Sequence, residues 1–73
     1  MALEKMTMPM VGKIVKLNVQ EGDSVNDGDI LLMFESMKLE MPLIATASGK
    51  VKDLKVKEGQ VVEAEEYLLS IEF

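Results

Sequence analysis

The second half of this 73-residue sequence repeats the first half at an offset of 37 positions. Residues 12–35 align on residues 49–72 without a gap, and 10 of the 24 aligned positions are identical. Repeats that stack into solenoids or propellers need more copies than two, because one unit cannot bury its own apolar face. Two copies instead predict two half-sandwiches that pack face to face about a pseudo-two-fold axis.

Within each half, short apolar segments alternate with turns that contain Gly, Asn or Asp, which is typical of a β-protein. The run Ile30-Leu31-Leu32-Met33-Phe34 is continuously apolar, which predicts a strand buried on both faces. From Met37 to Leu43 every second residue is large and apolar, which predicts a strand with one inward face. No long window has the 3.6-residue period of a helix. The expected strands are residues 4–9, 13–19, 24–26, 30–35, 39–45, 50–56, 61–63 and 67–72.

The segment between the fourth and fifth expected strands has to reverse the chain without a good turn sequence. No turn signal separates the two strands, so the reversal is expected near Ser36-Met37-Lys38. Two-residue hairpin turns favour Asn-Gly or Asp-Gly, which adopt positive φ at little cost, and Met and Lys do not. Such local conflicts concentrate at functional sites. The repeat also implies that this hairpin and the chain termini lie at opposite ends of the sandwich.

Composition excludes several classes of function. The chain has no cysteine and no histidine, so it lacks a thiolate nucleophile, a disulfide and the commonest metal ligand. The formal charge of −5 argues against nucleic acid and anionic membranes as partners. The apolar runs are far too short to span a membrane, and no signal peptide is visible, so we expect a cytoplasmic protein.

Two residue types could suggest other sites, but core or surface roles explain them better. The acidic groups Asp27/Asp29 and Glu63/Glu65/Glu66 fall in turns and at strand edges, where solvated charge is ordinary. Four of the seven methionines lie on expected strand faces or in the apolar run, which predicts core packing rather than metal binding. These four are Met6, Met8, Met10 and Met33. We therefore expect no catalytic residue and no metal site.

The hairpin sequence resembles the attachment segment of biotinyl domains, the biotin carboxyl carriers. Glu35-Ser36-Met37-Lys38-Leu39 is similar to their usual Glu-Ala-Met-Lys-Met. The resemblance covers nearly the whole chain and includes Gly28-Asp29 ten residues before the lysine, Pro42 and the Glu-Gly turns. It implies an all-β flattened barrel or sandwich of two four-stranded antiparallel sheets, of the hammerhead type. It also implies one biotinyl domain over residues 1–73, with repeat halves 12–35 and 49–72 and an attachment hairpin at 35–41.

The resemblance further implies that Lys38 carries biotin in an amide bond, made by a biotin protein ligase. Met37 and Leu39 would be the flanking residues that the ligase recognises, and Glu35, Ser36 and Glu40 would form the hairpin context. An amine must lose a proton before it attacks, and an ordinary lysine is protonated near neutral pH. The ligase is therefore expected to activate the amine. Biotin carboxylase and carboxyltransferase or decarboxylase components would be the other partners.

Two departures from the family pattern leave alternatives open. Leu39 stands where the family usually has Met, and Ser36 stands where Ala is common; serine there also occurs in sequences that resemble the lipoyl-carrying H protein of glycine cleavage. The first alternative is a lipoyl carrier on the same fold, although lipoyl domains usually have Asp-Lys-Ala at positions 37–39. The second is an unmodified β-sandwich that serves only as an interaction module. The mass of the native protein separates the three hypotheses.

Overall fold

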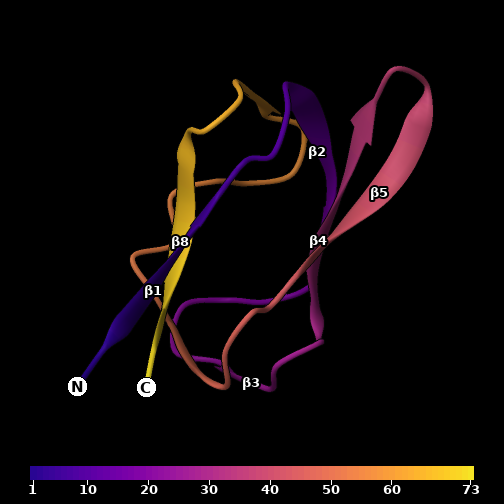
Figure 1. Cartoon of the computed structure of the whole chain (residues 1–73). Helices are drawn as coiled ribbons and strands as arrows, with labels where there is room; N and C mark the ends of the chain where they lie inside the picture. The colour runs from indigo at the N-terminus through magenta and orange to yellow at the C-terminus, as the bar shows by residue number, and fades with distance from the viewer.

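The computed structural model describes all residues, Met1–Phe73, and consists of eight strands in two antiparallel sheets (Figure 1). The strands are β1 (Leu3–Thr7), β2 (Gly12–Leu17), β3 (Ser24–Val25), β4 (Ile30–Ser36), β5 (Leu39–Ile44), β6 (Gly49–Lys52), β7 (Val61–Val62) and β8 (Tyr67–Glu72). One sheet has the order β1-β8-β6-β3, and the other has the order β5-β4-β2-β7. The predicted all-β fold of two four-stranded sheets is confirmed. No helix in the chain has the length and apolar character needed to cross a membrane.

The two sheets follow the sequence repeat. A shift of 37 residues carries β1, β2, β3 and β4 onto β5, β6, β7 and β8, and it carries one sheet order onto the other. Each half also completes the sheet of the other, because β3 pairs with β6 and β7 pairs with β2. The turns interlock in the same way: the Gly22 N–H donates to Val51 O at 2.8 Å, and the Gly59 N–H donates to Ile14 O at 2.7 Å. Neither half can therefore form its sheet without the other.

The core lies between the sheets and contains sixteen buried apolar residues. Leu31, Leu32, Leu68 and Leu69 are all fully buried. The prediction that residues 30–34 are buried on both faces is wrong, because Ile30 is 45% exposed and Met33 is only partly buried. A two-layer sandwich covers one face of each sheet and leaves the other to solvent. The register between β4 and β5 shifts between Ile30 and Leu32, and this bulge lets two consecutive leucines turn inward.

The prediction that four methionines pack in the core is correct for two of them. Met6 and Met8 are buried in the core, at 7% and 1% exposure. Met33 is half-buried, and Met10 is 36% exposed in the connection that follows β1. The strand β1 ends at Thr7, so the alternation that buries Met6 no longer constrains Met10.

The sixth strand ends earlier than the sequence predicts. Strand β6 stops at Lys52 rather than continuing to residue 56, because Asp53 takes a left-handed conformation with φ of 52°. The carboxylate of Glu21 holds this corner: it accepts the Leu54 N–H at Oε1 and the Asp53 N–H at Oε2, both at 2.9 Å. In the other half, Glu58 accepts the Leu17 N–H at 2.9 Å. Each half therefore supplies a carboxylate that satisfies backbone donors in the other.

Glu21 should contribute an acid-sensitive part of the stability. The hydrogen bonds from the Leu54 and Asp53 N–H groups, with smaller help from Lys52 and Lys55, hold the pKa of Glu21 below its ordinary value of 4.5. A lowered pKa in the folded state stabilises the fold above the unfolded value, and that contribution disappears as the pH falls through the folded value. We expect Glu21→Gln to destabilise the protein at neutral pH and to lose that effect progressively as the pH falls below 4.5 and through the lowered pKa of Glu21.

Urea denaturation of both proteins at neutral pH and at a series of pH values below 4.5 measures this difference. Asp27→Asn, which changes an exposed turn carboxylate that accepts no backbone hydrogen bond, is the matched control. A Glu21→Gln deficit that stays constant across the acid range would contradict the assignment.

Gly22 and Gly59 should respond equally to substitution. Both have a φ of 89°, and a Cβ at either position would meet no atom within 4 Å. The cost of alanine is therefore backbone strain alone, about 1 kcal/mol at each position. Chemical denaturation of Gly22→Ala and Gly59→Ala should give the same loss within error. If alanine were tolerated at one turn but strongly lowered the free energy of unfolding at the other, the two-fold symmetry would not extend to the energetics.

Candidate attachment hairpin

The β4–β5 hairpin reverses at Met37 and Lys38, the segment that the sequence singles out. Ser36 and Leu39 form the last cross-strand pair, so the loop contains two residues. Their φ values are 54° and 66°, and positive φ at both central residues is the geometry of a type I′ turn. Neither residue is glycine, so each carries a strain of about 1 kcal/mol. The expected conflict between sequence and turn geometry is present in the structure.

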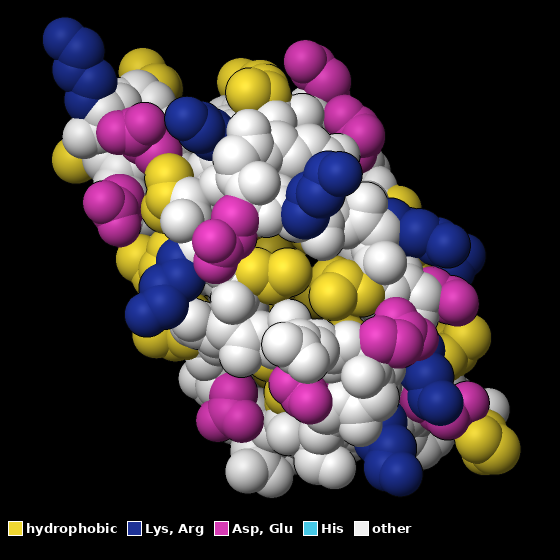
Figure 2. Space-filling view, turned by 180° about the vertical axis from the view of Figure 1, so that it is seen from behind, with side chains coloured by type: hydrophobic (Ala, Val, Ile, Leu, Met, Phe, Trp, Pro, Cys, Tyr) yellow, Lys and Arg dark blue, Asp and Glu magenta, His cyan; other side chains and the backbone are white.

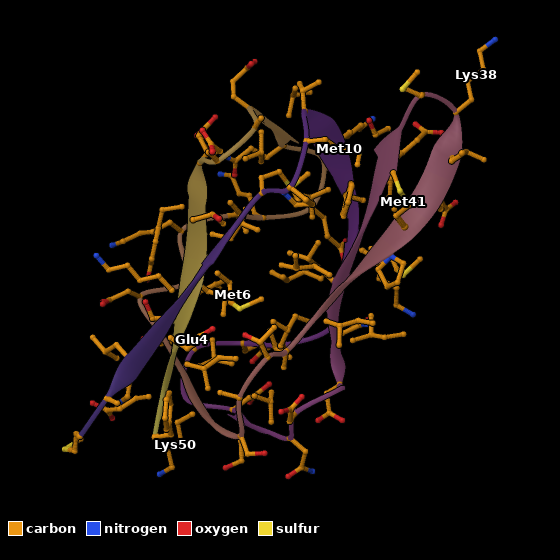
Figure 3. The ribbon with its side chains drawn as sticks, viewed as in Figure 1. Glu4, Met6, Met10, Lys38, Met41 and Lys50 are labelled. Atoms are coloured by element: carbon orange, nitrogen blue, oxygen red, sulfur yellow. The ribbon has the colours of Figure 1, made fainter.

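Lys38 lies at the far tip of the molecule. The hairpin projects beyond the sandwich on one side, and both termini lie at the opposite end (Figure 1). The side chain of Lys38 extends outward from the tip, away from the body of the protein (Figure 3). The only ion pair in the chain joins Lys52 and Glu72 at 3.9 Å, so the Lys38 ammonium group is unpaired. Its primary amine is fully available to a partner.

The hairpin is the place where the repeat is asymmetric. Ala2 and Phe73 correspond, by the 37-residue shift, to Leu39 and Ser36. The Ala2 N–H donates to Phe73 O at 2.7 Å and the Phe73 N–H donates to Ala2 O at 2.9 Å, so the termini pair as the hairpin strands do. At one end of the sandwich this pair is joined by Met37-Lys38, and at the other end the chain is open. The predicted opposition of termini and hairpin is therefore confirmed.

The apolar side chains that flank Lys38 are exposed to solvent. Met37 is 89% exposed and Leu39 is 65% exposed, whereas Leu43 further down the strand is buried. The inward face predicted for residues 37–43 is therefore wrong at the tip, because the hairpin extends past the opposing sheet. Apolar, acidic and basic side chains lie together on this projecting end, at the upper left when it is seen from behind (Figure 2).

The base of the hairpin is fixed by Ser36. Its side chain is only 7% exposed, and its hydroxyl donates to the backbone carbonyl of Val11 at 2.8 Å. Gly12 allows the close approach of these segments, because a Cβ there would lie 2.8 Å from the carbonyl oxygen of Glu35. The sequence pattern did not predict the hydrogen bond from Ser36 to Val11. The available signal was a small polar residue at an inward position, two residues after the buried Phe34.

Glu35 and Glu40 place negative charge on the outer face of the hairpin. They are directly opposite each other across β4 and β5, and both are exposed. Like charges in this position weaken a strand pair. Lys13 is opposite Glu35 on the other side, across β2 and β4, and it partly balances the two carboxylates. The lysine tip therefore stands above an acidic pair and is flanked by two apolar side chains.

Comparison with known proteins assigns the family. The sequence model of the biotin/lipoyl family, described as "Biotin-requiring enzyme", matches residues 4–71. A biotin/lipoyl attachment protein of Bacillus subtilis is 38% identical over 65 residues, which are 89% of this chain and 89% of that protein. A biotin carboxyl carrier protein of Streptococcus mutans is 37% identical over 70 residues, 96% of this chain and 54% of that one.

A solved structure agrees with the sequence relatives. The crystal structure of Kluyveromyces lactis urea carboxylase matches 97% of this chain with a TM-score of 0.87 and 35% identity, and the match covers 6% of that larger chain. The fold, the family sequence model and the sequence relatives thus agree over most of the chain. The chain therefore belongs to the biotin/lipoyl attachment family.

Proposed function

We propose that this chain is a biotin carboxyl carrier and that Nζ of Lys38 bears the biotin through an amide bond. The observation that carries the proposal is the placement of an unpaired lysine at the tip of a projecting, strained two-residue turn, between the exposed apolar side chains of Met37 and Leu39. The similarity to a biotin carboxyl carrier protein and to a segment of a urea carboxylase supports it.

The residues of the hairpin fit covalent attachment. A primary amine is the group that forms an amide with a carboxylic acid, and Lys38 presents one that no carboxylate holds. In the proposed reaction the deprotonated amine attacks the acyl carbon of biotinyl-adenylate, the amide bond forms, and AMP leaves. No carboxylate of the chain pairs with the lysine, and we propose that a biotin protein ligase takes the proton. Biotin, once bound, supplies a ring nitrogen that can be carboxylated and decarboxylated.

The remaining hairpin residues position the lysine and present it. Met37 and Leu39 offer apolar surface for the ligase to cover. The hydrogen bond from Ser36 to Val11 fixes the base of the hairpin, and Glu35 and Glu40 supply the acidic outer face. The lysine side chain then acts as an arm at the end of a fixed support. We propose no catalytic residue in this chain.

The partners follow from the carrier role. A carboxyl carrier works between one component that carboxylates biotin and a second that removes the carboxyl group. We therefore propose a biotin carboxylase and a carboxyltransferase or decarboxylase as the two other partners, with residues 1–73 acting as one carrier domain. The match to a segment of a urea carboxylase is consistent with such an assembly.

Charging by the two classes of ligase tests the proposal against a lipoyl carrier. The wild-type chain should gain the mass of one biotin from a biotin ligase and ATP, and little or no mass from a lipoate ligase. The double variant Met37→Asp/Leu39→Ala places the lipoyl-type flanks on the same fold. A biotin ligase that covers apolar flanks would have to bury an unpartnered carboxylate, so biotin uptake should fall. Lipoate uptake should rise.

Intact mass in parallel assays reads both modifications, and circular dichroism checks that the double variant is folded. Efficient lipoylation of wild type with refusal of biotin would move the protein to the lipoyl class. Refusal of both groups by a folded wild-type chain would favour an interaction module without a prosthetic group.

A further inference from the structure

The methionines differ sharply in exposure, and the residue beside Lys38 is at one extreme. Met37 is 89% exposed, Met10 is 36% exposed, and Met6 and Met8 are buried at 7% and 1%. Met33 and Met41 are half-buried. Met1 is also fully exposed, but it lies at the end of the molecule opposite the hairpin. Among the methionines near the tip, Met37 alone therefore has a freely accessible thioether.

We propose that Met37 is a reversible oxidation site and that its sulfoxide slows the attachment of biotin to Lys38. The proposal rests on the proposed function for its consequence and on the structure alone for the site. Its setting is fixed by the turn: Met37 is the first central residue, with a φ of 54°, and directly precedes Lys38. The fold thus exposes the most oxidisable side-chain type of the hairpin next to the residue that is to be modified.

The oxidation is a two-electron oxygen transfer from a peroxide. The thioether sulfur of Met37 attacks the terminal oxygen of hydrogen peroxide, the O–O bond breaks, and the products are the sulfoxide and water. Sulfur is oxidised and the peroxide is reduced, with no other reactant. A methionine sulfoxide reductase reverses the change with a dithiol as reductant: the dithiol is oxidised to a disulfide, the sulfoxide is reduced to the thioether, and its oxygen leaves as water. The modification can therefore act as a switch.

The sulfoxide changes the surface that a ligase has to cover. A flexible apolar side chain becomes polar, with a strong hydrogen-bond acceptor. If a partner surface suited to an apolar neighbour closes over it, that acceptor is buried without a donor, which lowers kcat/KM by roughly tenfold. The core is unaffected, because the buried sulfur atoms of Met6 and Met8 are out of reach of the peroxide. The fold should therefore survive while loading slows.

The experiment treats the whole chain with graded hydrogen peroxide and then removes the peroxide with catalase before a biotin ligase is added. Peptide mass spectrometry gives the rate of sulfoxide formation at each methionine, and intact mass gives the rate of biotin uptake. Met37→Leu is the matched variant, since it keeps an apolar side chain and leaves every other methionine in place. Its uptake is compared before and after peroxide, so that it provides its own baseline. Met37→Gln supplies a permanent polar group at the same position.

The expected results are specific. Met37 should oxidise many times faster than Met6, Met8, Met33 and Met41, and uptake by the wild type should fall about tenfold in step with its sulfoxide. Reductase treatment should restore uptake. Met37→Leu should show the same rate before and after peroxide, and Met37→Gln should be about tenfold slower than wild type without any peroxide.

Three outcomes would overturn the inference. If a half-buried methionine were oxidised faster than Met37, Met37 would not be the preferred oxidation site. If chains oxidised at Met37 took up biotin at an unchanged rate, the sulfoxide would not slow attachment. If peroxide slowed biotin uptake by Met37→Leu as much as by the wild type, the effect would belong to another residue. Failure of the proposed function looks different, because untreated wild type would then take up no biotin while the peptide data still decide whether Met37 is the preferred oxidation site.

Discussion

Lys38→Arg should take up no biotin under conditions in which the wild-type chain is fully loaded. Arginine keeps the positive charge and much of the length, but its guanidinium group stays protonated and cannot act as the nucleophile. The substitution should leave the fold intact, because Lys38 is exposed and makes no ion pair. Surface changes of this kind alter stability by no more than about 0.5 kcal/mol. Intact mass after ligase treatment, with a thermal melt of the same sample, measures both effects.

The repeat supplies a control lysine for this experiment. Lys50 is exposed and lies at the end of the molecule away from the hairpin (Figure 3). Lys50→Arg should therefore be loaded like the wild type. Peptide mapping of the loaded protein should place a single biotin on Lys38. Biotin on Lys50, or on its repeat counterpart Lys13, would refute the assignment of the attachment site.

Leu31→Ala and Leu68→Ala should each cost 2–5 kcal/mol, roughly the range for a buried leucine. The two residues are equivalent by the 37-residue shift, and both are fully buried between the sheets. Truncation removes apolar contacts and leaves a cavity that the surrounding strands only partly fill. Because small domains are stable by only about 5–15 kcal/mol, such a loss is a large part of the total. Either variant should show a much lower melting temperature or be unfolded when isolated.

Urea denaturation followed by circular dichroism quantifies the loss, with Lys38→Arg as the exposed control. If Lys38→Arg melted as poorly as Leu31→Ala, the hairpin tip would be part of the stabilising core and the exposed-arm interpretation would fail. If Leu31→Ala were tolerated and Leu68→Ala were not, the two halves would contribute unequally to the core despite their matched burial.

The local sequence was sufficient to predict the succession of strands along the chain and the position of the candidate attachment hairpin. The repeat, the apolar segments and the glycine-containing turns predict all eight strands to within a few residues at most ends, because these signals act over short distances. The lysine between two apolar residues at a poor turn identifies the hairpin for the same reason. The resemblance to biotinyl domains then suggested the proposed cofactor, which residue patterns alone did not name.

Tertiary structure decided which side chains are covered. The exposure of Ile30 depends on a register shift between β4 and β5, and the exposure of Leu39 depends on how far the hairpin extends past the opposite sheet. The bond from Ser36 to Val11 joins residues 25 positions apart, and the early end of β6 depends on Glu21, which lies 32 positions before Asp53. Alternation along a strand indicates which residues share a face, but burial requires a second sheet to lie opposite that face. Only the packing of the two halves determines where that second sheet ends.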